Sequence, residues 1–105
     1  MSFNLVTRYG ESIYEPSLAD MQAALAELKQ PDPEHPDCYL THDESGWTLA
    51  AYGSGLMVWE NYTQQSGNGR HLRTTHAIIL QHWQALAAGK IAEIEKLAWQ
   101  PGYGQ

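Results

Sequence analysis

The sequence predicts an α+β fold, with an antiparallel β-meander of about four strands packed against two to three helices. Two observations support this prediction. Three strand-like runs, residues 38–42, 47–52 and 56–62, follow one another with only short turns between them. Segments with helical periodicity stand on either side of these runs, over residues 17–29 and 75–98. A chain of 105 residues suits one domain, here residues 1–105.

The N-terminal part predicts a strand followed by a helix. Residues 3–9 alternate in side-chain type as far as Gly10, which favours a first strand. Ser17 and Asp20 have the spacing of a capping box and mark the start of the helix. Lys29 suits its last turn, where the free carbonyl groups favour a cation, and the prolines of residues 31–36 forbid continuation. The apolar face of this helix repeats at Leu18, Met21, Leu25 and Leu28.

The central meander sorts its side chains onto two faces. The lengths of the turns at residues 43–46 and 53–55 place Leu40 opposite Leu49, and Leu49 opposite Trp59. A slip of one residue in the second hairpin would exchange the two sets in the third strand. Because both faces hold large apolar groups, either helices cover both or one face is kept for a partner. One face carries Leu40, Leu49, Met57 and Trp59, and the other Tyr39, Ala50, Tyr52, Leu56 and Val58.

The C-terminal third predicts a loop and two helices. Residues 63–73 are polar and glycine-rich, which indicates a mobile loop. Thr74 or Thr75 caps a helix that runs to about Ala88, and Gly89 is a natural residue to follow its end. A short helix over residues 90–98 comes next, and we expect Trp99 to pack back on the core.

Charge and composition limit the classes of partner. Twelve acidic and six basic residues give a net charge of −6, so we expect no direct nucleic-acid binding and an attraction to basic partners. Cys38 is the only cysteine, which rules out an internal disulfide and favours a reducing compartment. We see neither a signal-peptide pattern nor the ~18 consecutive apolar residues of a membrane span. The expected location is therefore the cytoplasm, with no membrane contact.

No group of residues has the spacing of a catalytic or metal site. His76 and His82 are six residues apart, so on one helix they point in different directions. We interpret Cys38 as a small buried hydrophobe, with a nucleophile paired to a distant histidine as the alternative. Asp43 and Glu44 are adjacent carboxylates in a turn, where solvated acids are common. We therefore expect no metal, no cofactor and no enzymatic activity.

Features of a protein-binding surface are better represented. The chain has four Trp and six Tyr but one Phe, and Tyr and Trp suit half-wet interfaces. Acidic segments 32–37 and 43–44 flank one strand, and Trp59 and three tyrosines lie on or next to the sheet, so aromatics rimmed by acids form a plausible patch. The competing interpretation is that the second helix covers this face and the acids are merely solvated. The expected partner-binding residues are Asp37, Tyr39, Asp43, Glu44, Tyr52, Glu60 and Tyr62.

Residues 37–49 and 52–59 resemble the central hairpins of the Imm1-type immunity proteins of bacterial polymorphic toxin systems. The closing part would be residues 78–99, with Trp83, Gly89 and Trp99 in the expected places, so the resemblance covers roughly residues 35–99. It implies a cytoplasmic protein that binds a cognate toxin domain and occludes its active site. It also implies a basic toxin, of a class that includes nucleic-acid- and nucleotide-modifying enzymes. The resemblance transfers no site residues.

Two other hypotheses stay open. The chain could be an effector chaperone or adaptor, or a module that associates with itself as a homodimer through an open sheet face. A small enzyme is the third possibility, and loss of activity on changing Cys38 or His76 would support it.

Overall fold

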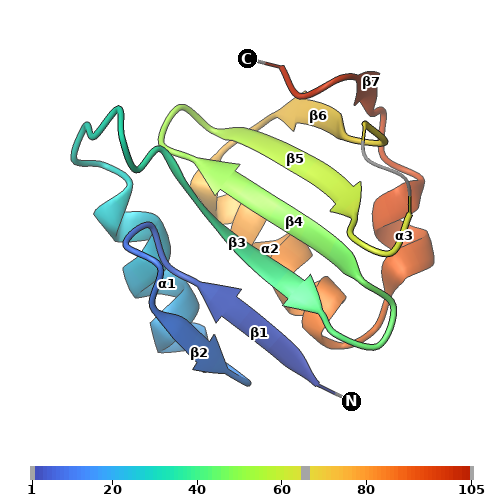
Figure 1. The fold of residues 1–105 in the computed structure, drawn as a ribbon, viewed down its shortest axis with the longest axis horizontal. Helices are drawn as coiled ribbons and strands as arrows, with labels where there is room; N and C mark the ends of the chain where they lie inside the picture. The colour runs from blue at the N-terminus through green and yellow to red at the C-terminus, as the bar shows by residue number, and fades with distance from the viewer. Residues whose placement is uncertain (1, 65–66, 105) are drawn as a thin grey trace.

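One antiparallel sheet with helices on a single face forms the fold (Figure 1). The computed structural model describes residues 2–64 and 67–104. The strands lie in the order β2-β1-β3-β4-β5-β6-β7, so the expected meander of about four strands is the centre of a seven-stranded sheet. In chain order the elements are β1 (Phe3–Val6), β2 (Ser12–Tyr14), α1 (Leu18–Glu27), β3 (Asp37–His42), β4 (Trp47–Tyr52), β5 (Leu56–Asn61), β6 (Arg70–Arg73), α2 (His76–Ala87), α3 (Ile91–Glu95) and β7 (Gln100–Pro101).

The register of the central strands is the predicted one. Leu49 lies opposite Leu40 on one side and opposite Trp59 on the other, and Ala50 pairs with Val58. Because side chains alternate along a strand, this register places the two predicted sets on opposite faces. In the described part of the chain, helices cover one face of the sheet and leave the other uncovered.

The core fills the space between the covered face and the helices. Met21 and Leu25 from α1 and Ile79 and Leu86 from α2 are buried against the strands. The Trp83 indole N–H donates to the carbonyl of Leu49 at 2.9 Å, so a backbone oxygen of the central strand satisfies this buried donor. The predicted caps of both long helices are confirmed: Ser17 and Asp20 form the capping box, and Thr75 caps α2. Leu18, predicted on the apolar face of α1, is 46% exposed.

Three tryptophans stack where α3 meets the sheet. The ring of Trp59 lies between those of Trp47 and Trp99, with centroid distances of 4.5 and 6.1 Å. The Glu95 carboxylate accepts a hydrogen bond from the Trp59 indole and forms an ion pair with Arg70. The Arg70 guanidinium also lies over the Trp47 ring at 5.9 Å, an arrangement that favours a cation–π contact. The expectation that Trp99 packs back on the core is confirmed.

Several boundaries differ from those predicted. The first strand stops at Val6 instead of residue 9, because the chain turns there and returns as β2, which pairs with β1. The loop prediction for residues 63–73 was wrong over its last four residues, which form β6. There Leu72 pairs with Met57 on the covered face, and this tertiary pairing overrides a polar local sequence. Residues 65 and 66 of that predicted loop lie outside the described residues. The last helix is shorter than residues 90–98.

A buried arginine, and not the predicted Lys29, binds the carbonyl groups at the end of α1. Arg8 is only 6% exposed, and its guanidinium donates to the carbonyls of Glu27, of Gln30 at 2.8 Å and of His35 at 3.0 and 2.9 Å. These charge-assisted bonds join the turn after β1 to the helix end and to the proline loop. Lys29 is exposed, and α1 has no basic residue in its last turn.

Substitution Arg8→Ala should lower the free energy of unfolding by about 3 kcal/mol, because three backbone carbonyls lose a charged donor in a water-poor site. Its matched control is Lys29→Ala, which removes an exposed cation near the same helix end and should cost at most about 0.5 kcal/mol. Urea unfolding of both variants gives the comparison. Equal losses would show that the buried guanidinium does not hold this region together.

Candidate functional site

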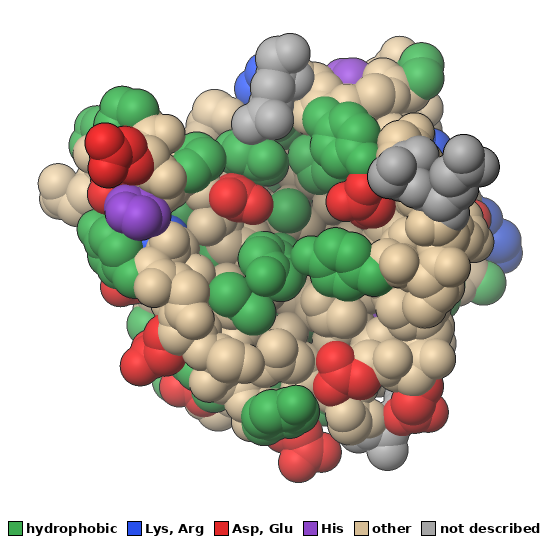
Figure 2. Space-filling view, viewed as in Figure 1, with side chains coloured by type: hydrophobic (Ala, Val, Ile, Leu, Met, Phe, Trp, Pro, Cys, Tyr) green, Lys and Arg blue, Asp and Glu red, His purple; other side chains and the backbone are tan. Residues whose placement is uncertain are grey.

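The uncovered face of the sheet is hollowed at its centre, over β3, β4 and β5. We call this depression the sheet hollow; its volume is about 150 Å³. Figure 2 looks onto this face: hydrophobic and tyrosine side chains gather over the central strands with acidic groups among them, whereas Lys and Arg lie toward the edge of the view. The hollow is lined by Asp37, Tyr39, Thr48, Ala50, Tyr52, Val58, Glu60, Tyr62 and Tyr103.

Strand register explains why a hollow exists here. Ala50 in the central strand pairs with Tyr39 on one side and with Val58 on the other. The methyl group of Ala50 therefore forms a low floor between taller side chains from β3 and β5. Tyr39 and Tyr62 meet edge to face on one side, with ring centroids 6.4 Å apart. The result is a concave surface with aromatic walls, of the kind that often anchors a binding partner.

Two carboxylates and four phenols set the electrostatics of the sheet hollow. Burial raises the pKa of Asp37, although its backbone N–H partly opposes this rise. Partial burial, the Tyr39 hydroxyl and the nearby carboxylates of Glu60 and Asp37 raise the pKa of Tyr62 to about 12. The lining therefore combines two carboxyl groups with phenol hydroxyls, of which that of Tyr62 stays protonated at neutral pH.

Tyr103 completes the rim and was missed by the sequence reasoning. Its hydroxyl donates to the Glu60 carboxylate, and this bond raises the pKa of Tyr103. Its ring lies against Gly69, where an added Cβ would come within 2.4 Å of the ring. The C-terminal segment is held there by β7 and by a 3.0 Å contact between His71 Nδ1 and the Gly102 carbonyl. No local pattern marks Tyr103, because its position depends on a two-residue strand far from β5 in the chain.

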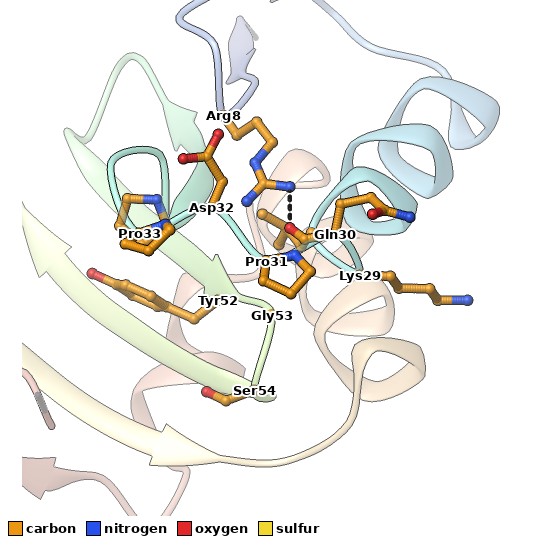
Figure 3. A pocket seen from close by; sticks show the side chains of 11 residues that line it. Arg8, Lys29, Gln30, Pro31, Asp32, Pro33, Tyr52, Gly53 and Ser54 are labelled. Carbon is orange, nitrogen blue, oxygen red and sulfur yellow. Dashed lines mark hydrogen bonds between the residues drawn. The ribbon is translucent and has the colours of Figure 1, made fainter.

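A second depression adjoins the first at Tyr52 and beside Asp37. This proline-loop cleft, of about 460 Å³, lies between residues 28–36 and the turn from β4 to β5. Figure 3 shows the Tyr52 ring on the strand side and Pro31 and Pro33 on the loop side. The dashed line is the hydrogen bond from the Arg8 guanidinium to the Gln30 carbonyl, which holds the proline loop beside this cleft. This cleft is larger than the sheet hollow, and the guanidinium of its buried Arg8 is bonded to backbone carbonyls.

The structure brings five of the seven expected binding residues together in the sheet hollow: Asp37, Tyr39, Tyr52, Glu60 and Tyr62. Asp43 and Glu44 lie elsewhere, in the turn after β3, six or more residues from Asp37 and so roughly 20 Å along the strand. There they bind the N-terminal segment, as the Ser2 hydroxyl donates to Asp43 at 2.6 Å and the Ser2 N–H to Glu44 at 2.9 Å.

The structure decides two points about the aromatic patch. Trp59, counted among its aromatics, is fully buried on the face that the predicted register assigns to it, opposite in parity to Glu60. The competing interpretation that the second helix covers the tyrosine face was wrong, since α2 packs on the other side of the sheet.

The interpretation of Cys38 as a buried hydrophobe is confirmed. Its side chain is inaccessible and faces α1, on the opposite side of the sheet from the hollow. Burial first, with nearby Asp37 and Glu27 adding to it, raises the thiol pKa to about 12, so the thiol stays protonated at neutral pH. Over residues 2–64 and 67–104, no three His, Cys, Asp or Glu side chains cluster as metal ligands.

Comparison with known proteins gives no match, whether to family models, to curated proteins or to solved structures. The resemblance to Imm1-type proteins therefore stays a prediction. Within the described part of the chain, no helix has the length and apolar content needed to cross a bilayer.

The variant Asp37→Asn should be more stable than the natural protein at neutral pH. The folded-state pKa of Asp37 is raised above its ordinary value of 3.8, so the folded chain binds its proton more tightly and loses stability as the pH rises through that pKa. The advantage of the variant should vanish at a pH below 3.8. Urea unfolding as a function of pH measures it. A variant less stable at neutral pH would show that the carboxylate supports the fold.

Substitution Gly69→Ala should displace the Tyr103 ring and break its bond to Glu60, because the new methyl group occupies the place of the ring. The pKa of Tyr103 should then fall toward its ordinary value, which ultraviolet titration of the tyrosines detects. Gly10→Ala is the control, since a Cβ there meets nothing within 4 Å and the turn between β1 and β2 lies at the opposite edge of the sheet from β7. An unchanged titration in the Gly69 variant would contradict this packing.

Proposed function

We propose that this protein is an immunity protein that binds the toxin domain of a cognate bacterial effector and neutralises it by occluding the active site. In this proposal the uncovered sheet face, with the sheet hollow at its centre, is the contact surface. The tyrosines supply contact area with little side-chain entropy to lose, and the carboxylates steer a basic toxin surface toward it. The resemblance of residues 35–99 to Imm1-type proteins is what suggests a toxin domain as the partner.

The observation that carries the proposal is the composition of the sheet hollow. Its lining includes four tyrosines and two carboxylates but no Lys, Arg or His. Within the described residues, neither Asp37 nor Glu60 has a basic side chain as an ion-pair partner. A surface with uncompensated negative charge beside large aromatic groups is complementary to a basic protein surface.

The same charges argue against self-association through this face. A symmetric dimer would bring the same patch from both copies together. The carboxylates of Asp37 and Glu60 from one copy would then meet those of the other in a partly dehydrated interface, where like charges cost several kcal/mol. A basic partner faces no such cost, so this surface favours a complex with a different, basic protein over a symmetric homodimer.

Co-expression in bacteria with the toxin domain encoded by the neighbouring gene tests the proposal. The natural chain should restore growth, because the bound toxin is inactive. The double variant Tyr39→Ala/Tyr52→Ala should weaken the purified complex by at least about 2 kcal/mol, roughly thirtyfold, if these rings are central anchors. Calorimetry on the purified pair gives this affinity.

The matched control is Tyr14→Ala on β2. Tyr14 is 72% exposed and lines neither the sheet hollow nor the proline-loop cleft, so its loss should leave both the affinity and growth rescue unchanged. Circular dichroism confirms that each variant stays folded. Failure of the natural chain to restore growth would overturn the proposed immunity function. Binding only to unfolded or non-toxic parts of the effector would indicate a chaperone or adaptor instead.

A further inference from the structure

We infer that the sheet hollow is a receptor for one arginine side chain, whose guanidinium group lies against the tyrosine rings and faces the carboxylates of Asp37 and Glu60. In the complex of the proposed function this arginine belongs to the toxin domain, so its biological role rests on that function. The inference adds the chemical group that the surface recognises.

Size and shape favour a single planar cation. A volume of about 150 Å³ is small against the several hundred that pockets for drug-sized molecules occupy, and it suits the end of one long side chain. The floor is formed by small side chains, Thr48, Ala50 and Val58, so the guanidinium can descend between the rings. Aromatic faces attract a cation placed over them, and a flat guanidinium can stack on them as well.

The acceptors come from both sides of the central strand. Asp37 stands on β3 opposite Tyr52, and Glu60 stands on β5 opposite Thr48, so the two carboxylates reach the hollow from the strands that flank β4. Tyr103 fixes the Glu60 side chain through its hydroxyl, which leaves this carboxylate pre-ordered before a ligand arrives. A guanidinium has five N–H donors in one plane and can meet several acceptors at once.

The same features favour arginine over lysine. An ammonium group is a compact, strongly hydrated point charge, whereas guanidinium is less hydrated and stacks on aromatic rings. An ammonium group that entered the aromatic sheet hollow would lose bound water and regain few hydrogen bonds in its place. A guanidinium group loses less hydration and gains stacking on the tyrosine rings.

The test uses amide NMR spectra of the full chain titrated with N-acetyl-arginine methylamide. Its citrulline counterpart is the control, since a urea group replaces the guanidinium with nearly the same shape and no charge. Shifts caused by arginine should saturate and concentrate on the residues of the sheet hollow. The citrulline and lysine counterparts should each bind at least about tenfold more weakly.

Two variants separate the hollow from general negative charge. Ala50→Leu fills the floor but removes no charge, and it should abolish the saturable shifts. The pair Asp43→Asn/Glu44→Gln removes two acids outside the hollow and should leave them unchanged. Circular dichroism checks the folding of each variant. If Ala50→Leu does not fold, Glu60→Gln replaces it as the test variant: it keeps an acceptor for Tyr103 and should weaken arginine binding about tenfold.

Equal binding of citrulline or lysine would overturn the inference, as would shifts centred on the turn at residues 43–46 or no saturable shift. If arginine does not bind but Tyr39→Ala/Tyr52→Ala still weakens the toxin complex, the inference fails and the proposed function stands. If arginine binds in the hollow but the natural chain does not neutralise the toxin, the site stands and the proposed function fails.

Discussion

The pairing of Leu49 between Leu40 and Trp59 is the constraint on which the rest of the structure depends. It sends three large apolar side chains of adjacent strands to one face, where α1 and α2 cover them. By the alternation of a strand it also sends Tyr39, Ala50 and Val58 to the other face. A shift of one residue would place Trp59 in solvent and Glu60 in the core, so burial holds the register firmly. The composition of the sheet hollow is therefore a consequence of how the core is packed.

The core and the uncovered face make opposite contributions to stability. The stacked rings of Trp47, Trp59 and Trp99, with Arg70 and Glu95 beside them, close one end of the sheet and bury a large apolar area. On the uncovered face, Asp37 is partly buried in the absence of a described ion-pair partner, which disfavours its charged form. Groups kept at a cost to folding stability concentrate at functional sites, which supports the proposal that this face binds a partner.

Local sequence patterns predicted the elements that depend on local interactions. The capping box at Ser17, the cap at Thr75 and the register of the two central hairpins could all be predicted from spacing and turn length. That register placed Tyr39 and Tyr52 on one face. The remaining features depend on distant parts of the chain. Arg8 looks like an ordinary strand residue until α1 and the proline loop bring three carbonyls to it, and Tyr103 reaches Glu60 only because β7 pairs with β6. Asp43 and Glu44 lie outside the sheet hollow because they follow the far end of β3, and nearness in sequence to a strand does not show which end of it a side chain lies at.

A sheet packed on one side only divides the chain between two selective pressures. Positions such as Leu40 and Met57 are confined by close packing, where the change of one methylene group is felt. Positions such as Tyr39 and Glu60 line the sheet hollow on the uncovered face, where substitutions have little consequence for the core. The fold could therefore acquire new binding specificities by substitutions on the uncovered face alone, while the packed face and its helices stay the same.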